Sequence, residues 1–241
     1  MRSVRRVAAL YDVHGNLPAL EAVLAEVERE GVDTIVVGGD VAAGPFPHDS
    51  LERLRGLGDP ALFVRGNCDR ELADDEEPHD EPTAWSKQRL SASEREFLST
   101  RPAGVTVDVS GLGPVRFVHG SPRGDEDFIT LLTPEPLLRE AVAGVEERVV
   151  VCGHSHQQFL HDVDGMRVAN AGSVGFPFAE APGAYWLLLG PDLEHRRTEY
   201  DLDAAAAAIR RSGFPTVDEF LSKLRDPEPS AVAAARIEAA R

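Results

Sequence analysis

The sequence is poor in cysteine and has no long apolar run. Only Cys68 and Cys152 occur among 241 residues, so we expect neither a disulfide framework nor a zinc ribbon. No apolar stretch approaches the roughly 20 residues of a membrane span, so we expect no membrane association. The apolar stretch near the N-terminus reaches Asp12 too early for a signal-peptide core. A cytoplasmic location with reduced cysteines is the expectation.

Basic residues are also scarce, because 25 Lys and Arg face 41 Asp and Glu, which gives a formal net charge of −16. A phosphate backbone needs neutralising cations, so we do not expect general nucleic-acid binding. A small anionic substrate stays compatible with this charge, since a bound metal ion dominates its local field. The composition is that of an ordinary globular protein, and it leaves the oligomeric state open.

The first 70 residues alternate between strand and helix patterns. The segment 15–31 predicts a helix with Asn16 as N-cap and Gly31 as its stop. We expect strands in 4–12, 33–40 and 61–69, and a second helix in 48–58. Such a βαβαβ order predicts a parallel sheet with right-handed crossovers.

Strand signals dominate the rest of the chain up to residue 201. The acidic segment 71–82 is expected to be a solvated loop, and Ser93 with Glu96 predicts a capping box for a helix in 93–99. Later strands are expected in 105–110, 115–120, 159–170 (a hairpin turning at Asp164-Gly165), 185–190 and 195–201. We expect two packed sheets flanked by helices in a single α/β domain, 1–241, with 203–241 as a helical C-terminal appendage.

Polar side chains follow each apolar strand of the predicted sheets. In open α/β sheets, ligands bind beyond the carboxyl ends of the strands, so these side chains should converge. Alone, any one of them is equally explained as a polar loop or turn residue. Together they form a candidate site made of Asp12, His14, Asp40, Asn67, His119, His154 and His156.

This ligand set contains nitrogen and oxygen donors and no thiolate, which suits Mn, Fe, Co or Zn. Seven ligands exceed the needs of one tetrahedral ion. With one bridging carboxylate they would fill most positions of two ions about 3.5–4 Å apart, as in two-metal hydrolases. The predicted cofactor is therefore a pair of divalent or mixed-valence transition-metal ions.

Five motifs resemble the signature of the calcineurin-like metallophosphoesterases: DVH at 12–14, GD at 39–40, GN at 66–67, HG at 119–120 and GHSH at 153–156. The resemblance implies a double β-sheet sandwich flanked by helices, in four layers (αββα). It also implies that Asp12, His14, Asp40 and His156 hold one ion. Asp40 would bridge to a second ion held by Asn67, His119 and His154. The segment 170–175 resembles a family segment near the site, with Ala171 in place of a proline.

Cys68 departs from the family pattern, in which many members carry histidine after the GN motif. The GNCD form is similar to a small bacterial and archaeal phosphodiesterase-like branch. Since the usual histidine helps to protonate the leaving group or hold phosphate, the general acid is left open. Asp69 is a candidate catalytic residue, with a cap or a supporting hydrogen bond as the alternative. Asn67 is a second candidate, through contact with the phosphoryl group.

The predicted function is a binuclear metal-dependent phosphoesterase whose nucleophile is a metal-bridging hydroxide. A small phosphodiester is the favoured substrate, and Arg123 is a candidate substrate-binding residue, with a surface ion pair as its alternative. Two other functions stay open: a phosphomonoesterase acting on nucleotides or phosphoproteins, and a non-catalytic scaffold on the same fold. Neither the physiological substrate nor the identity of the metal follows from the sequence.

Overall fold

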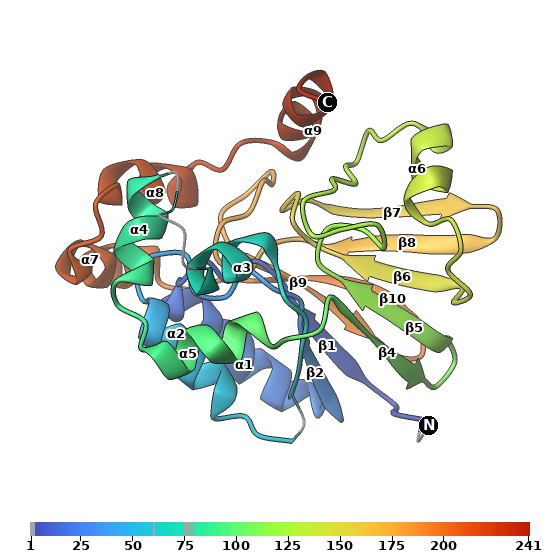
Figure 1. The fold of residues 1–241 in the computed structure, drawn as a ribbon, viewed down its shortest axis with the longest axis horizontal. Coiled ribbons are helices and arrows are strands. Elements are labelled where there is room, and N and C mark those ends of the chain that lie inside the picture. The colour runs from blue at the N-terminus through green and yellow to red at the C-terminus, as the bar shows by residue number, and fades with distance from the viewer. Residues whose placement is uncertain (1–2, 60, 75–77, 79) are drawn as a thin grey trace.

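Two five-stranded sheets form the centre of the computed structural model, which describes residues 3–59, 61–74, 78 and 80–241 (Figure 1). The first sheet has the order β10-β9-β1-β2-β3. It consists of β1 (Val7–Leu10), β2 (Thr34–Val37), β3 (Ala61–Phe63), β9 (Ala184–Leu189) and β10 (Leu193–Thr198). The second sheet has the order β4-β5-β6-β8-β7. It consists of β4 (Gly104–Val109), β5 (Gly113–Val118), β6 (Val149–Cys152), β7 (Gln158–Val163) and β8 (Met166–Ala171).

The expected parallel unit at the N-terminus is confirmed. β1 pairs in parallel with β2, and β2 pairs in parallel with β3. The connecting helices are α1 (Leu17–Glu30) and α2 (Pro47–Arg55). The Asn16 side chain accepts a hydrogen bond from the Ala19 N–H group, and Gly31 ends α1 in the left-handed region at φ 61°. Both helix boundaries are where the sequence places them.

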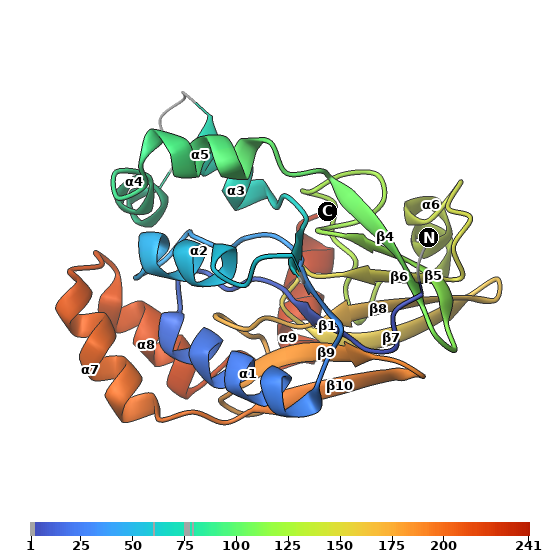
Figure 2. The same cartoon turned by 90° about the horizontal axis from the view of Figure 1, so that it is seen from below.

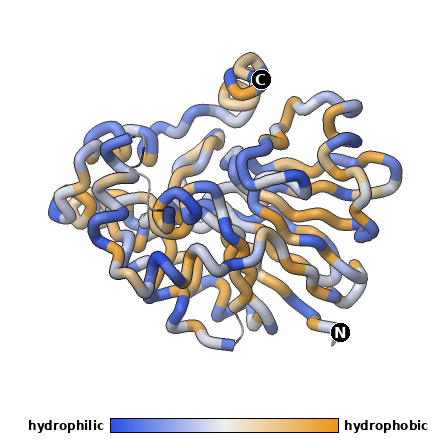
Figure 3. Tube along the Cα trace, viewed as in Figure 1, coloured by the Kyte–Doolittle hydropathy of each residue, from blue (hydrophilic) through white to orange (hydrophobic). Residues whose placement is uncertain are grey.

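Alternating residues of β1 divide the apolar interior into layers. Ala8 and Leu10 belong to a cluster with residues of α1 and α2, whereas Val7 and Ala9 belong to a cluster between the two sheets. Successive side chains of a strand point to opposite faces, so one buried strand serves both layers. The outer face of the second sheet packs against α6 (Glu135–Ala141). Figures 2 and 3 show this sandwich, with hydrophobic residues concentrated along the strands. The expected fold class is confirmed.

Three local predictions were wrong. The strand expected in 61–69 ends at Phe63, and residues 67–69 are the start of a helix. The capping box of α5 (Ala92–Ser99) is formed by Ser91 and Glu94, two residues earlier than expected. The acidic segment is not one loop, because α3 (Asn67–Ala73) and α4 (Glu81–Lys87) occupy its two ends. Residues 75–77 and 79 of that segment lie outside the described part of the chain.

Three helices follow β10: α7 (Leu202–Ser212), α8 (Val217–Arg225) and α9 (Ser230–Ala239). The first two share an apolar cluster that includes Ile209, Phe214 and Phe220, with Phe176 packed against it. α9 lies apart from them, beyond the linker 226–229 (Figure 1). The division into one domain with an appendage stays a prediction. None of the helices among the residues described is long and apolar enough to cross a bilayer.

Candidate metal centre

The seven predicted ligands lie at the carboxyl ends of strands, as the topology requires. Asp12 and His14 follow β1, Asp40 follows β2, and Asn67 opens α3 just after β3. His119 follows β5, while His154 and His156 follow β6, which runs parallel to β5. Hydrogen bonds and close contacts across the two sheets bring all seven together.

Two groups of ligand atoms consist only of predicted ligands. Asp12, His14 and His156 form one group, and Asp40, His119 and His154 form the other. A third candidate group, His14, Asp40 and Cys68, shares one residue with each of them. Within each group the candidate ligand atoms all lie within 4.8 Å of one another. Asn67 adjoins the second group, because its Oδ1 lies 3.0 Å from His119 Nε2. The first two groups agree with the two ligand sets that the family resemblance implies.

Asp40 lies between the two groups. Its Oδ2 is 3.4 Å from His119 Nε2 and 3.9 Å from His14 Nε2. Its other oxygen, Oδ1, accepts a hydrogen bond of 2.9 Å from the Cys68 N–H group, which fixes the carboxylate. A single carboxylate oxygen therefore faces one imidazole of each group.

Three of the histidines point Nε2 inward because their Nδ1 atoms are engaged by backbone. His14 Nδ1 lies 3.3 Å from the Ala43 carbonyl oxygen. His119 Nδ1 lies 2.9 Å from that of Gly38, and His156 Nδ1 lies 2.6 Å from that of Phe176. An Nδ1–H group that donates to a carbonyl leaves a lone pair on Nε2, which is the form a metal binds. The backbone thus sets the tautomer of these ligands.

Several buried polar atoms in this centre lack a suitable partner within the described protein. Asp12 Oδ1 and His154 Nε2 are buried without a hydrogen bond. His14 Nε2 and His156 Nε2 lie only 3.0 Å apart, although both Nδ1 atoms already face carbonyl oxygens. Two imidazole lone pairs at that distance repel each other unless a proton or a metal ion lies between them. The donor set and these unpaired atoms fit transition-metal ions.

The electrostatic balance of the centre also favours cations. Burial opposes ionisation of Asp40, but His119 and His14 outweigh it and hold the pKa of that carboxyl well below its usual range. Burial likewise opposes the charged form of His119, yet Asp40 raises the pKa of this imidazole to about 10. Burial and the neighbouring His119 lower the pKa of His154 to about 4. Because metal ions compete with protons for such ligands, an ion would displace the proton on His119.

The backbone at these ligands is strained. Among the described residues, six that are not glycine adopt positive φ, between 44° and 62°, and one of them is Asp164 in the expected hairpin turn. The other five are predicted ligands: Asp12, His14, Asp40, His154 and His156. Non-glycine residues in this region cost about 1–3 kcal/mol each and cluster at functional sites. The sequence pattern gave no sign of this strain.

Tight backbone packing supports the ligands. Ser173 Oγ donates to the Asp12 carbonyl at 2.7 Å, and Asn170 Nδ2 donates to the Gly153 carbonyl at 2.6 Å. A Cβ atom on Gly66 would lie 2.1 Å from Asp40 Oδ1, so only glycine fits there. The segment 170–175 therefore lies at the centre, as expected, with Ala171 buried in it.

Asp69 has a different place from the one expected of a general acid. It is buried, and its two oxygens accept hydrogen bonds of 2.9, 3.0 and 3.0 Å from the N–H groups of Asp40, Val41 and Gly66. Burial and the nearby Asp40 carboxylate raise the pKa of Asp69 to about 6. These contacts with backbone match the alternative for Asp69, a supporting hydrogen bond that positions the Asp40 loop, and a role as proton donor stays a prediction.

Neither Cys68 nor Arg123 is an obvious general acid in place of Asp69. Burial and the Asp40 carboxylate raise the pKa of the Cys68 thiol, which keeps it neutral. The Arg123 guanidinium donates to both oxygens of Asp127, at 3.0 and 2.7 Å, and is close to half exposed. The contacts of Arg123 thus match its alternative as a surface ion pair, and a role in substrate binding stays a prediction.

Two stacked aromatic contacts at the centre were not foreseen. The ring of Phe128 stacks on His154, with centroids 4.0 Å apart, and the ring of Phe178 stacks on His156 at 5.5 Å. Both phenylalanines come from loops distant in sequence from the histidine they contact. No local pattern marks such residues, so sequence reasoning had no signal for them.

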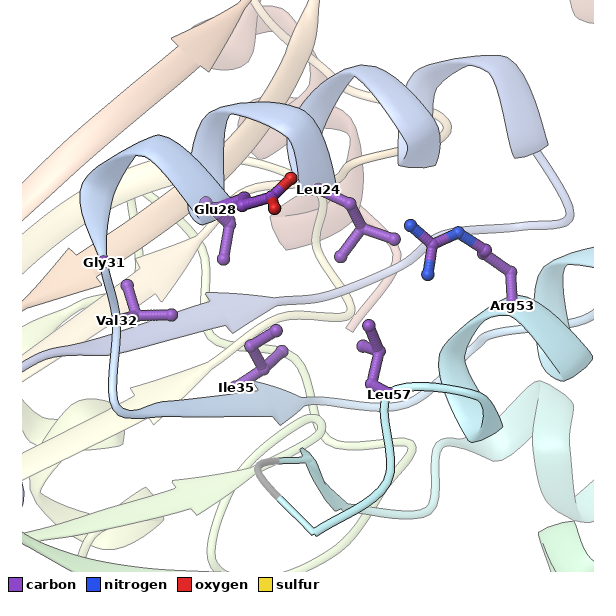
Figure 4. Close-up of a pocket in the computed structure, with 8 residues that line it drawn as sticks. Leu24, Glu28, Gly31, Val32, Ile35, Arg53 and Leu57 are labelled. Carbon is purple, nitrogen blue, oxygen red and sulfur yellow. The ribbon is translucent and has the colours of Figure 1, made fainter.

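A hollow beside α1 lies away from the metal centre. A cavity of about 400 Å³ is lined by the C-terminal half of α1 and by residues of α2 and β2. Figure 4 shows Leu24, Ile35 and Leu57 directed into it, with Glu28 and Arg53 at its rim. Ile35 lies near the start of β2, whereas Asp40 follows its end, so this cavity lies towards the opposite end of the strand from the ligands.

A double β-sandwich with two adjoining Asp/His ligand groups at the strand ends defines a metal-dependent phosphoesterase class. The sequence profile of the calcineurin-like phosphoesterase superfamily domain matches residues 6–189, and the chain belongs to this superfamily.

Three proteins are similar to this chain over most of its length. A metallophosphoesterase from Sphaerobacter thermophilus is 26% identical, with a TM-score of 0.74, and the match covers 92% of this chain and 98% of that one. The chain is 29% identical to phosphodiesterase YfcE of Escherichia coli, over 73% of this chain and 83% of that protein. It is 27% identical to the uncharacterized protein MJ0912 of Methanocaldococcus jannaschii, over 87% and 93% of the two chains.

Proposed function

We propose that the chain is a binuclear metal-dependent phosphoesterase that hydrolyses small phosphodiesters. The position of Asp40 carries the proposal, because one of its oxygens faces an imidazole of each ligand group. A shared carboxylate is what two ions a few ångströms apart require. Similarity to phosphodiesterase YfcE supports the choice of a diester. The net charge of −16 favours a small substrate over a nucleic-acid backbone.

The residues of the chain have distinct tasks in such a reaction. Two bound transition-metal ions, of Mn, Fe, Zn or Co, would activate water for attack and neutralise charge on the phosphoryl oxygens. With ions bound, His14, His119 and His156 would present unprotonated Nε2 atoms to them, because backbone carbonyls accept from their Nδ1 atoms. The Asn67 amide lies beside His119 and has N–H groups to donate to a phosphoryl oxygen.

Protonation of the leaving group is the weak step of this site. The Cys68 thiol is held neutral and donates hydrogen bonds poorly, and the Asp69 carboxylate is occupied by backbone. Phosphoesters whose leaving groups are already acidic should therefore be the better substrates. The unpaired thiols of Cys68 and Cys152 agree with the cytoplasmic location that we also propose.

The test combines metal content with hydrolysis on one preparation. The protein is stripped with a chelator and reloaded with Mn²⁺, and turnover of bis(p-nitrophenyl) phosphate is compared with that of p-nitrophenyl phosphate and of a nucleotide. We expect two ions per chain, activity only after reloading, and faster turnover of the diester. Asp40→Asn should lose both ions and activity, whereas the exposed control Asp59→Asn should keep both.

Four outcomes would change the conclusion. Activity in a demonstrably metal-free sample, or fewer than two ions per chain in a fully active one, would refute the binuclear mechanism. Faster turnover of monoesters would favour the phosphomonoesterase alternative. Full metal loading without hydrolysis of any ester would favour the non-catalytic scaffold.

A further inference from the structure

The C-terminal helix α9 contacts two loops that adjoin the metal centre. One loop, 176–180, follows the segment 170–175, and the other, 128–133, precedes α6. Figures 1 and 2 show α9 at the end of the chain, separated from α8 by its linker. The profile match of the superfamily domain ends at residue 189, so α9 lies outside it.

The last turn of α9 is bonded to loop 128–133. Glu238 Oε1 accepts hydrogen bonds from the hydroxyl groups of Thr130, at 2.6 Å, and Thr133, at 2.8 Å. Both threonines are buried, and the Glu238 side chain is 18% exposed. Arg241 lies 3.3 Å from the other carboxylate oxygen of Glu238 and balances its charge. Hydrogen bonds to a carboxylate are stronger than neutral ones, especially when shielded from water.

Loop 128–133 in turn runs beside the segment that carries His154. Its Phe128 ring stacks on the His154 ring at 4.0 Å and an interplanar angle of 21°. Ser155 Oγ donates to the Ile129 carbonyl at 2.7 Å, and the Leu131 N–H group donates to Gln157 Oε1 at 3.0 Å. A shift of this loop would therefore reach His154 through three separate contacts.

Ser230 in the first turn of α9 and Arg236 further along the helix make the corresponding contacts on the other side. Ser230 Oγ donates to the Phe178 carbonyl at 2.9 Å, and the Arg236 guanidinium lies 5.3 Å from the Phe178 ring centroid. The Phe178 ring stacks on His156, and the backbone N–H group of Phe178 donates to the His156 carbonyl at 3.0 Å. The Phe176 carbonyl of the same loop accepts from His156 Nδ1.

We infer that α9 positions both histidines of the GHSH motif, with Glu238 acting on His154 through loop 128–133 and Ser230 acting on His156 through loop 176–180. His154 and His156 belong to different ligand groups, so each end of α9 sets the affinity of one ion position. Glu238 is a positioning residue, since it touches neither ion nor substrate. The inference rests on the proposed function, because it concerns the two ions of that centre.

The test is a titration of the metal-free full-length chain with Mn²⁺, in which free Mn²⁺ is followed by electron paramagnetic resonance. For Glu238→Ala we expect one of the two dissociation constants to rise about tenfold, the lower end for partners that orient metal ligands, and the other to change little. Glu238→Gln keeps an acceptor oxygen for both threonines and should restore most of the affinity. Asp218→Ala removes an equal charge from an exposed ion pair in α8 and should have no effect.

A second variant tests the route through the loop. Phe128→Leu removes the stacked ring and should weaken the same ion position as Glu238→Ala, and the two changes together should be less than additive. Thermal unfolding of each metal-free variant separates a local effect from a loss of fold. If Glu238→Ala is too unstable to titrate, Glu238→Gln and Phe128→Leu decide the question.

The outcomes for α9 and for the proposed function are distinguishable. Wild type that binds fewer than two Mn²⁺ ions overturns both. Wild type that binds two ions, with Glu238→Ala unchanged, overturns only the role of α9. Equal weakening of both positions in Glu238→Ala, without rescue by Glu238→Gln, would also overturn it, because the effect would then follow general stability.

Discussion

Replacing Asp69 by Asn separates its positioning role from a role as proton donor. In the wild type, Asp69 Oδ2 accepts from the N–H groups of Asp40 and Gly66, and Oδ1 accepts from Val41. An amide keeps one oxygen and replaces the other with an NH₂ group, which cannot accept. At least one buried backbone N–H group then faces another donor, and the remaining hydrogen bonds lose their charge assistance.

The cost of Asp69→Asn follows from these contacts. One buried N–H group left unsatisfied costs about 1–3 kcal/mol, and relief of the repulsion between Asp69 and Asp40 offsets the weaker bonds to the remaining oxygen. We expect a loss of about 1–3 kcal/mol, which lowers the melting temperature by about 2–12 °C in a domain of this size. Because the Asp40 N–H group is among the donors, Mn²⁺ binding should weaken too.

Thermal unfolding of the metal-free protein by circular dichroism measures this prediction, with Asp59→Asn as an exposed control that should unfold like wild type. The reasoning is refuted if Asp69→Asn has the melting temperature of wild type and binds Mn²⁺ with wild-type affinity. If that variant also lost a factor of 10²–10⁴ in kcat, Asp69 would be the general acid after all.

Two further predictions concern the missing acid and the acid stability of the fold. With metal content matched, Cys68→His should speed up the hydrolysis of alkyl esters more than that of aryl esters. The dependence of log(kcat/KM) on leaving-group pKa should therefore become flatter than in wild type. A flat slope already in wild type, where chemistry limits the rate, would mean that another residue supplies the proton. Burial opposes ionisation of Glu94, but hydrogen bonds from Ser91 and His48 outweigh it and lower its pKa. The ionised Glu94 thus stabilises the fold above the pKa of about 4.3 that it has in the unfolded chain, and this contribution is lost as the pH falls through the lower folded value. Melting temperatures of wild type and Glu94→Gln should converge between about pH 5 and pH 3; a constant difference would contradict the assignment.

Periodicity and strand ends predicted most of the sandwich, because each buried strand has a pattern of its own. The shifted capping box shows where local pattern fails. Ser91 with Glu94 and Ser93 with Glu96 both satisfy the same spacing, so sequence alone cannot rank them. The structure selects Glu94, whose carboxylate also lies 2.7 Å from His48 in α2. The contact of Glu94 with α2 thus favours one of two capping boxes that the sequence of residues 91–96 allows equally.

The places of the candidate metal ligands in the fold were predictable for the same reason as the strands, since each follows an apolar run within a few residues. The supporting residues were not. Phe128 lies 26 positions before His154, and Glu238 lies 108 positions after Thr130, without a repeat or motif that links them. Asp69 was placed correctly beside the centre, but the direction of its carboxylate depends on the backbone of Asp40 and Val41. Such orientations arise only when distant segments pack.

The left-handed backbone of five ligands has an evolutionary consequence. At Asp12, His14, Asp40, His154 and His156, glycine would relieve strain that the present side chains impose on the folded chain. Selection for stability alone would thus tend to erase all five residues, and a lineage that had given up metal chemistry would be free to let them drift. The five strained ligands are thus a cost in folding stability that the proposed ions would offset when they bind the folded chain.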